Sequence, residues 1–268
     1  MLRIVALIAA RNEELYIGRC LEHLWQNGVQ FCLIDNGSTD RTPQIAERFW
    51  GRGLIRIVSV EYPGFYDWLG LLRLKQQLAV DLDADWFIHH DADEIMEAPN
   101  TNVRLDDAIA SADAAGFTAI NFDEFVFVPT DECESFEGSD YVERMSYYYF
   151  FEPHPVRLVR CWKKAPDIEL AESGGHGANF AGRSLFPKNF VLRHYIMLSL
   201  AHGCRKYSTH RKYSQEEVRD RGWHGWRARF RDEMIRLPGR EQMLECNRSA
   251  NWNRTRPYKD HIFISNSQ

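Results

Sequence analysis

The sequence lacks the two glycine-rich motifs that most often mark a phosphate-binding loop. No G-x-G-x-x-G opens a helix after a strand, and no G-x-x-x-x-G-K-[ST] occurs anywhere in the 268 residues. Both motifs work by bringing backbone N–H groups close to phosphate oxygens. Their absence argues against a Rossmann dehydrogenase and against a P-loop kinase.

Cysteine is scarce and hydrophobic runs are short. The six cysteines show no C-x-x-C spacing, so reduced thiols are expected. The apolar run from Ile4 to Ala10 is too short to span a membrane, and it lacks the basic flank and cleavage pattern of a signal peptide. We therefore expect a cytoplasmic protein, either free or in peripheral contact with the inner face of the membrane.

Basic residues are scarce in the first two thirds of the chain. Residues 1–180 hold 15 Lys and Arg against 30 Asp and Glu, whereas residues 181–268 hold 18 against 8. A basic terminal region can bind phosphates, an anionic membrane surface or nucleic acid. It can equally form a helical cap that pairs with the acidic body, and charge alone does not choose between these.

Strand-like and helix-like segments alternate through the first hundred residues. Strands are predicted at 2–10, 30–34, 54–60 and 86–90, and helices at 13–26, 42–50 and 66–80. The first strand is continuously aliphatic rather than alternating, which is typical of a parallel sheet covered on both faces. The pattern predicts βαβ units in an α/β fold, with a doubly wound, mostly parallel sheet flanked by helices.

The second half is less regular. Strands are predicted at 119–128 and 190–195, and one or two strands interrupted by Pro153 and Pro155 at 145–164. An acidic loop and a glycine-rich loop around His176 separate them. From Ser199 onward the chain reads as helical, basic and aromatic, including one helix from Gln215 to Arg236. The expected architecture is therefore an α/β domain with a C-terminal helical extension.

Polar residues follow three of the predicted strands. Arg11, Asn12 and Glu13 follow the first strand, Asp35 begins the segment after the second, and Asp91 and Asp93 follow the fourth. Ligands of doubly wound sheets bind at the carboxyl ends of the strands. Paired carboxylates there suit Mg²⁺ or Mn²⁺, which in turn bind substrate phosphates.

A polar turn after an edge strand is the plain alternative for a single Asp-x-Asp. Asp81, Asp83 and Asp85 illustrate it, since they lie on the approach to the strand and fit a solvated linker. Asp35 can accept a hydrogen bond from the imide of uracil or thymine, or from a ribose hydroxyl. Gly37 would let the backbone pass close to such a ligand.

Three segments, in this order and spacing, resemble a family-2-type glycosyltransferase of the GT-A fold. They are Ala10–Glu13, Asp35–Asp40 and Asp91–Asp93, and the resemblance covers roughly residues 1–100. It implies transfer of a sugar from a nucleotide-diphospho-sugar donor to an unidentified acceptor, with Mn²⁺ or Mg²⁺ as cofactor. Asn36 is a departure, because the family often has a second aspartate there.

The resemblance also implies roles for individual residues. The substrate-binding set comprises Ala9, Ala10, Arg11, Asn12, Glu13, Asp35, Asn36, Gly37, Asp91 and Ala92. The metal would be held by Asp91, Asp93 and His194, with His176 as the competitor for the third place. Arg73 and Lys75, on the third helix, are either further contacts to the diphosphate or solvated helix charges.

An inverting reaction also needs a carboxylate base that accepts the proton of the acceptor hydroxyl. The later Glu-Asp motif that supplies this base in many relatives is not found here. Glu172, beside the glycine-rich loop, is the preferred candidate and Asp167 the second, with Asp123 and Glu124 behind them.

These assignments predict a GT-A catalytic domain over residues 1–198 and a basic extension over 199–268 packed on it. Within the domain, residues 1–100 would bind the nucleotide and 101–198 the acceptor, which is a glycan, a lipid-linked molecule or another anionic molecule. One alternative is a nucleotidyltransferase or metal phosphohydrolase that uses the same carboxylates. Another is a noncatalytic binder of nucleotide sugars or nucleic acid.

Overall fold

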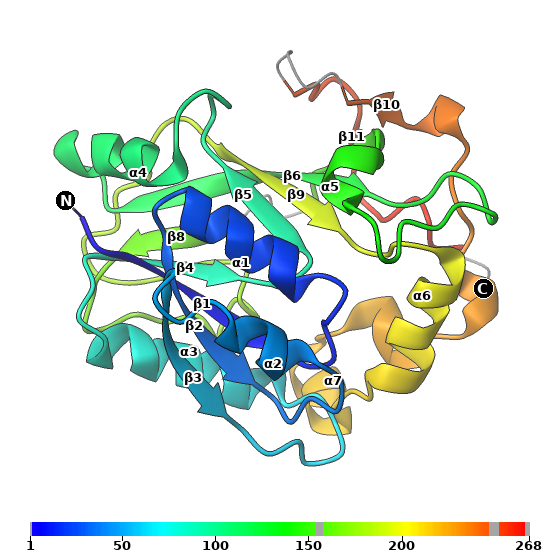
Figure 1. The fold of residues 1–268 in the computed structure, drawn as a ribbon, viewed down its shortest axis with the longest axis horizontal. Helices are drawn as coiled ribbons and strands as arrows, with labels where there is room; N and C mark the ends of the chain where they lie inside the picture. Colours follow the sequence, from blue (N-terminus) through cyan, green and yellow to red (C-terminus); the bar gives the residue numbers. More distant parts are fainter. Residues whose placement is uncertain (1, 154–157, 247–251, 266–268) are drawn as a thin grey trace. The chain divides into compact units, whose positions relative to one another are not determined.

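The computed structural model describes residues 2–153, 158–246 and 252–265 (Figure 1). The chain divides into two compact units, each built from separate stretches of sequence. The first unit comprises residues 1–63, 67–122 and 157–192, and the second comprises 64–66, 123–156 and 193–268.

Four parallel strands form one side of the sheet in the first unit. They are β1 (Ile4–Ala10), β2 (Gln30–Asp35), β3 (Leu54–Ser59) and β4 (Trp86–His90), in the order β3-β2-β1-β4. Six of the seven residues of β1 are buried, as its continuous apolar run predicts, and all residues of β4 are buried, including His89 and His90.

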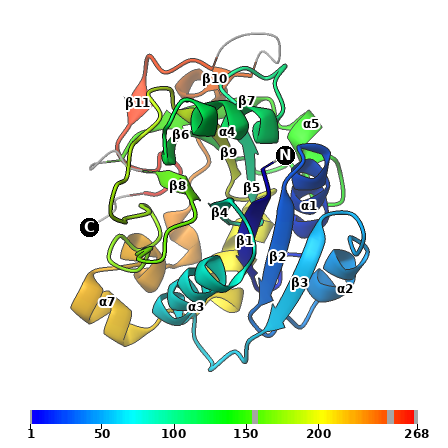
Figure 2. The same ribbon diagram turned by 90° about the vertical axis from the view of Figure 1, so that its left-hand side faces the viewer.

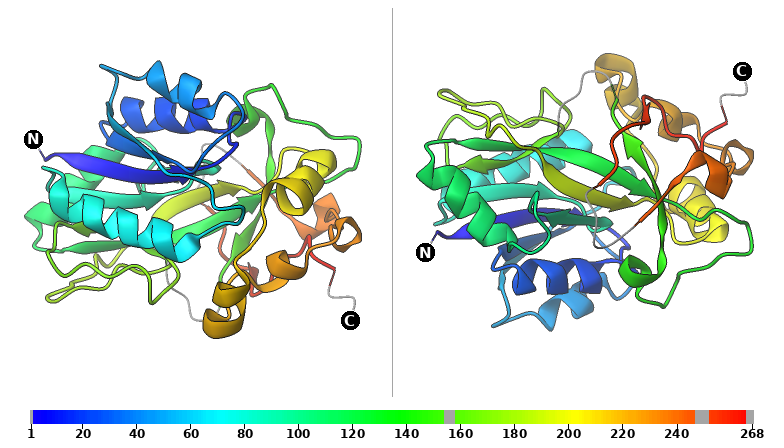
Figure 3. Two further views of the ribbon diagram at one scale, coloured as in Figure 1. Left: turned by 90° about the horizontal axis from the view of Figure 1, so that it is seen from below. Right: turned by 90° about the horizontal axis from the view of Figure 1, so that it is seen from above.

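Helices cover both faces of these strands. The helices α1 (Ile17–Gln26) and α2 (Thr42–Glu47) lie on one face, and α3 (Trp68–Asp81) lies on the other (Figures 2 and 3). The side chain of Asp67 caps α3 by accepting a hydrogen bond from the backbone of Gly70 at 3.0 Å. The predicted doubly wound arrangement is thus confirmed for this half.

The order of the strands creates a switch point beside β1. From β1 the chain moves outward through β2 to β3, and it then returns to place β4 on the other side of β1. Parallel registers pair Ala10 with Asp35 and Ile8 with His90, so the three strands end at the same edge. A crevice outside such a switch point is where α/β sheets bind their ligands.

The remaining strands of this sheet run antiparallel. Strand β8 (Val159–Lys163) pairs with β4, and β6 (Ala119–Phe127) pairs with β8. The α/β class is confirmed, and the sheet is mixed because β1 to β4 are parallel whereas β8 pairs antiparallel with both β4 and β6. In the described part of the first unit, two elements had no sequence prediction, the strand β5 (Glu94–Glu97) and the helix α4 (Leu105–Ala114).

The second unit combines short strands with short helical segments. Strand β7 (Tyr147–Phe151) pairs with the later residues of β6, and β9 (Phe190–Tyr195) enters this unit at Arg193. Two short strands pair with β7, and they are β10 (Leu244–Glu245) and β11 (Pro257–Tyr258). The α-helices are α5 (Tyr141–Arg144), α6 (Leu200–Cys204) and α7 (Gln215–Arg221). The π-helix η1 (Arg205–His210) follows α6, and the 3₁₀ segments are η2 (Gly225–Arg229), η3 (Asp232–Met234) and η4 (Arg240–Gln242).

The prediction of one long helix from Gln215 to Arg236 is wrong. The observed helix, α7, ends at Arg221 because Gly222 adopts a left-handed conformation with φ of 65°, which terminates the hydrogen-bonding pattern. Only 3₁₀ turns follow it. In the part of the chain that the structure describes, no helix combines the length and apolar character needed to cross a membrane.

Candidate functional site

Two groups of residues lie at the carboxyl edge of the parallel strands. The first group is a pair of hydrogen-bonded loops, residues 11–14 after β1 and residues 36–42 after β2. The second group is a charged cluster formed by Lys75, His89, Asp91, Glu94 and Arg160. All of these residues belong to the first unit.

Asn12 joins the two loops. Its backbone N–H donates to Oγ of Ser38 at 3.1 Å, and its side-chain Oδ1 accepts from the backbone of Thr39 at 2.7 Å. Asn12 has φ of 54°, a left-handed conformation that asparagine tolerates better than most residues. The asparagine of the first motif therefore has a structural task, which is to fix the second motif.

Asp40 and Thr42 complete this network. The carboxylate of Asp40 accepts from the backbone of Glu14 at 3.0 Å and from the backbone of Thr42 at 2.9 Å. The hydroxyl of Thr42 accepts from the backbone of Glu13 at 2.8 Å. The later residues of the D-N-G-S-T-D motif thus hold the loops together.

Asp35, Asn36 and Gly37 form the part of the loops that a ligand can approach. Asp35 is buried, and its carboxylate accepts from the backbone of Ser38 at 3.3 Å. Oδ1 of Asn36 is buried without a hydrogen-bond partner in the described part of the chain. A buried acceptor of this kind requires an explanation, and a missing ligand is one.

Arg11 lies beside this turn. Its guanidinium donates to the carbonyl of Asn36 at 3.0 Å and to that of Gly37, and it stacks on the ring of Tyr62 at 3.6 Å. Gly37 has φ of 61°, and a Cβ there would lie 3.2 Å from the backbone nitrogen of Tyr62. Glycine is therefore required at this position for both conformation and space.

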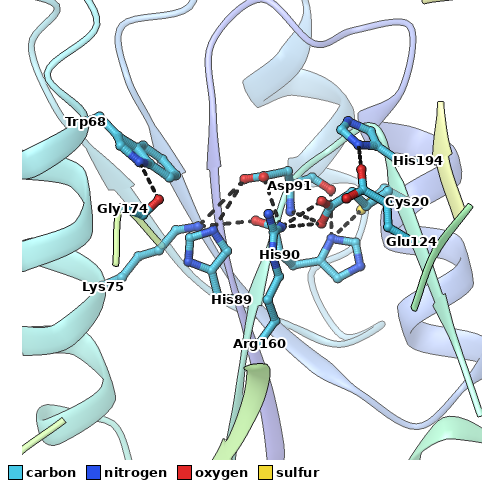
Figure 4. Close-up of polar contacts among 11 residues, drawn as sticks. Cys20, Trp68, Lys75, His89, His90, Asp91, Glu124, Arg160, Gly174 and His194 are labelled. Atoms are coloured by element: carbon cyan, nitrogen blue, oxygen red, sulfur yellow. Dashed lines mark hydrogen bonds and ion pairs between the residues drawn. The ribbon is translucent and has the colours of Figure 1, made fainter. Parts of the chain in front are cut away.

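The charged cluster converges on Asp91 from several elements (Figure 4). Its carboxylate lies 3.1 Å from Nη1 of Arg160 on β8, 4.0 Å from Nζ of Lys75 on α3, and 3.8 Å from Nε2 of His89 on β4. The same nitrogen of Arg160 lies 2.7 Å from the carboxylate of Glu94. Arg160 thus connects two carboxylates in a largely buried setting.

Burial and charge set the protonation of the cluster. Burial would raise the pKa of Asp91, but Arg160 and Lys75 hold that pKa well below its usual range. Burial lowers the pKa of Lys75 to about 8, although Asp91 opposes this. Burial also lowers the pKa of His89 well below its ordinary value and that of His90 to about 4. At neutral pH the cluster therefore combines an ionised aspartate with neutral imidazoles.

The glycine-rich segment packs against the cluster. The indole of Trp68 donates to the carbonyl of Gly174 at 2.9 Å, and its ring contacts His89 edge-on at 5.6 Å (Figure 4). Gly175 has φ of 84°, and a Cβ there would lie 2.9 Å from His89. This segment therefore holds His89 in place, while His176 itself is exposed.

The donor chemistry of Asp91 and Asp93 fits a divalent cation. Asp91 is ionised with a side chain 29% exposed, and Asp93, two residues on, is buried. Within the described ranges, no three His, Cys, Asp or Glu residues form a preformed metal cluster. Mg²⁺ is commonly held by one or two carboxylates together with substrate phosphates and water, so two carboxylates suffice.

His194 lies on β9 in the second unit, where its Nδ1 is 2.6 Å from the carboxylate of Glu124. Its predicted role as a metal ligand beside Asp91 and Asp93 stays a prediction. Ala9 and Ala10 lie at the end of β1, and Ala92 is buried between the two aspartates.

The predicted catalytic bases occupy different surroundings. Glu172 is exposed in the turn that carries Gly174 and Gly175. Asp167 is also exposed, and its carboxylate accepts from the backbone of Ala181 at 2.8 Å. Asp123, in the second unit, pairs with Arg254 at 2.5 Å. The choice of base stays a prediction.

The sequence placed only Arg73 of the third helix among the site residues, although Lys75 was an equal candidate for the diphosphate. Arg160 was expected to pair with the acidic body, and Glu94 was given no role of its own. Arg73 is exposed on α3, whereas Lys75 lies on the buried face of the same helix. Lys75 is four residues after Leu71, and a cation on that apolar face is a signal that it has a partner inside. The pairing of Glu94 with Arg160 had no comparable signal, because the two residues are 66 positions apart.

Comparisons with known proteins agree with the motifs. Residues 5–64 match the family model described as "Glycosyl transferase family 2". A curated relative is the "Lipopolysaccharide core biosynthesis glycosyltransferase LpsC" of Rhizobium meliloti (strain 1021), 30% identical over 93 residues. The match covers 34% of this chain and 32% of that protein, so the chain spans about a third of the relative's length.

The chain is also similar to parts of solved structures. One is S. aureus TarS 1–349, at 15% identity with a TM-score of 0.41, over 72% of this chain and 60% of that one. Another is glucosyl-3-phosphoglycerate synthase from Mycobacterium tuberculosis, at 18% identity with a TM-score of 0.33, over 47% and 44%. That synthase was solved with Mn²⁺ and UDP, and a TarS 1–349 structure was also solved with UDP.

The family model covers β1, β2 and β3 together with both hydrogen-bonded loops. This is the stretch on which two of the three motifs were found, and the predicted resemblance is confirmed there. Over residues 5–64, this chain is similar to glycosyl transferase family 2.

Proposed function

We propose that this protein transfers a sugar from a nucleotide-diphospho-sugar to an acceptor glycan, using Mn²⁺ or Mg²⁺, with inversion at the anomeric carbon. The observation that carries the proposal is the meeting of two features at one sheet edge. The family-2 loops end β1 and β2, and the ionised Asp91 follows β4 on the other side of the switch point.

The hydrogen-bonded loops would bind the nucleoside. The carboxylate of Asp35 would accept from the imide of the base or from a ribose hydroxyl, and the buried Oδ1 of Asn36 offers a second acceptor. Gly37 keeps the backbone free of a side chain at the point where the ligand passes. Asn12 acts indirectly, by fixing the turn that follows Asp35.

The charged cluster would hold the diphosphate. Asp91 and Asp93 are the residues that would bind the divalent ion, which stabilises the negative charge of a departing nucleoside diphosphate. Lys75 and Arg160 keep Asp91 ionised, so that its oxygens are available as ligands at neutral pH. Glu94 neutralises the charge of Arg160, so the arginine competes less with the divalent ion for the phosphates.

The acceptor side of the proposal rests on fewer observations. Glu172 is the preferred base, since it is exposed in the turn packed against Trp68 and His89, and Asp167 is the second choice. Residues 101–198 would shape the acceptor site. The name of the relative from Rhizobium meliloti supports a glycan as the acceptor class.

The test is release of sugar from a panel of nucleotide-diphospho-sugars, measured with Mn²⁺, with Mg²⁺ and with EDTA. The proposal predicts slow hydrolysis of one donor even without an acceptor, and its loss in EDTA. A noncatalytic binder would give no release from any donor. A nucleotidyltransferase or phosphohydrolase would instead release a nucleoside monophosphate or inorganic phosphate.

A further inference from the structure

The second unit contains a cavity of about 720 Å³ that the site described above does not use. Its wall includes cationic, aromatic and hydroxyl side chains. The lining residues include Phe65, Tyr207, Arg211, Tyr213 and Arg227, which all belong to the second unit. A volume of this size is within the range of pockets that bind small organic ligands.

Positive charge dominates the wall. Arg211, Lys212 and Arg227 line it, whereas Glu216 is the acidic residue among the lining residues. The nearby Glu217 is buried and lies 2.7 Å from Nε2 of His224.

Arg211 and Arg227 both act electrostatically on the phenol of Tyr213. Burial raises the pKa of Tyr213, and the guanidinium groups of Arg211 and Arg227 both oppose that rise. Burial and Arg211 lower the pKa of Arg227, but Tyr207 and Tyr213 outweigh them, so that its pKa lies above the ordinary value. Two like charges that face the same phenol repel each other, so an anion between them would be stabilised.

Aromatic side chains complete the wall. Tyr213 is buried, and its ring lies 4.5 Å from that of His224, while Arg211 lies 5.9 Å from the ring of Tyr66. The backbone of Tyr66 donates to the carbonyl of Lys212 at 2.6 Å, which holds the segment 64–66 against the cavity. Flat aromatic faces beside polar groups suit a sugar ring, whose C–H face is apolar.

The backbone is unusual at one point in the wall and at one point beside it. Tyr207 lies on the π-helix η1, a conformation that is rare and is found frequently at functional sites. His224 has φ of 70° although it is not a glycine, and it immediately precedes the 3₁₀ segment that carries Arg227. Strain of this kind persists where the surroundings hold a side chain in a required position.

We infer that this cavity binds a phosphorylated sugar, with the phosphate between Arg211 and Arg227 and the sugar ring against the tyrosines. A phosphate monoester presents several oxygens to two guanidinium groups, which bind such groups in a fork-like geometry. That this sugar belongs to the acceptor rests on the function proposed above. Binding itself does not depend on that function.

The test is calorimetric titration of the full chain with glucose 6-phosphate, at constant ionic strength. The expected result is binding that is at least tenfold tighter than that of glucose and of inorganic phosphate. Arg227→Gln should weaken it at least tenfold. The matched control is Arg229→Gln, which removes an exposed arginine from the same 3₁₀ segment outside the cavity wall and should change affinity less than twofold.

Two further variants keep the test decisive. Arg211→Gln repeats it from the other side of the cavity, in case Arg227→Gln does not fold. Asp91→Asn, in the other unit, should leave glucose 6-phosphate binding unchanged. Equal affinity in wild type and both arginine variants, or equal affinity for inorganic phosphate and the sugar phosphate, would overturn the inference. So would loss of binding in Asp91→Asn alone.

The same samples are titrated with UDP and Mn²⁺. Unchanged UDP affinity in Arg227→Gln shows that the variant is folded and that any loss of glucose 6-phosphate binding is local. If no sample binds UDP, the proposed function fails, and the glucose 6-phosphate titration still decides the inference about the cavity.

Discussion

The hydrogen-bonded loops and the charged cluster lie at the same edge of one sheet, but they are held in different ways. The loops use backbone N–H groups paired with the side chains of Asn12, Ser38 and Asp40, from two motifs fewer than thirty residues apart. The cluster uses ion pairs between α3, β4, β5 and β8, with partners up to 69 positions apart.

This difference has consequences for stability. A neutral hydrogen bond contributes roughly 1 kcal/mol to the free energy of unfolding, so the stability of the loops is the sum of many small contributions. A buried ion pair is costly to break, because the remaining charge stays desolvated. We therefore expect the cluster to respond strongly to single substitutions and the loops to respond weakly.

The largest effect is expected for Arg160→Met. It leaves the buried Glu94 without its cationic partner, which should lower the free energy of unfolding by about 3–5 kcal/mol. Chemical denaturation measures this directly. The double variant Arg160→Met/Glu94→Gln should recover a large part of the loss, and a double variant no more stable than the single one would show that the ion pair is not the cause.

Gly175→Ala should have the next largest effect. It adds the strain of a positive φ and a contact of 2.9 Å with His89. Gly182→Ala is the matched control, since Gly182 has φ of 74° and open space around its Cα. The strain should cost about 1–2 kcal/mol in both, and the contact about 1–3 kcal/mol more in Gly175→Ala. Equal thermal stability of the two variants would show that the glycine-rich segment does not press on His89.

A smaller effect is expected from pH. Because the pKa of Lys75 is about 8, its positive charge is present below that pH and lost above it. UDP affinity with Mn²⁺ should therefore fall about tenfold between pH 7 and 9, one unit above the pKa. Lys75→Met should remove this dependence, while Arg73→Met, on the exposed face of the same helix, should retain it.

The stability contributed by Lys75 should change in the opposite direction. Its pKa is lower in the folded protein than the ordinary 10.5, so the unfolded chain binds more protons between about pH 8 and 10.5. Stability from this group should therefore rise with pH in that window. If the affinity of the wild type for UDP with Mn²⁺ did not change between pH 7 and 9, the charge of Lys75 would have no part in UDP binding.

The smallest effect is expected for Ser38→Ala. It removes the acceptor for the backbone of Asn12 at a position that is half-buried, and water can replace part of the interaction. A loss of about 1 kcal/mol in unfolding free energy is expected, with UDP affinity reduced less than threefold. A loss as large as that of Arg160→Met would contradict the contrast between loops and cluster.

The same contrast explains what could be predicted from the sequence. Strand β4 was predicted with its observed bounds, and the strand–helix alternation fixed the edge where Asp35 and Asp91 lie, because local patterns determine both. Helix α4 was missed because its apolar positions are mostly alanines among aspartates, which give a weak stripe. Lys75 was considered only as a companion of Arg73, and Arg160 only as a partner of the acidic body, because Asp91, which both contact, is distant in sequence.

The most direct test of the central claim is calorimetric titration with UDP, with and without Mn²⁺, in the wild type, in Asp91→Asn and in Asp83→Asn. Asp83 is a fair control, since its side chain is 98% exposed on the approach to β4. The account predicts that Mn²⁺ strengthens UDP binding at least tenfold in the wild type and in Asp83→Asn, and that this gain is lost in Asp91→Asn. UDP affinity that is the same with and without Mn²⁺ and the same in Asp91→Asn would contradict the account. So would the absence of binding of any nucleoside diphosphate.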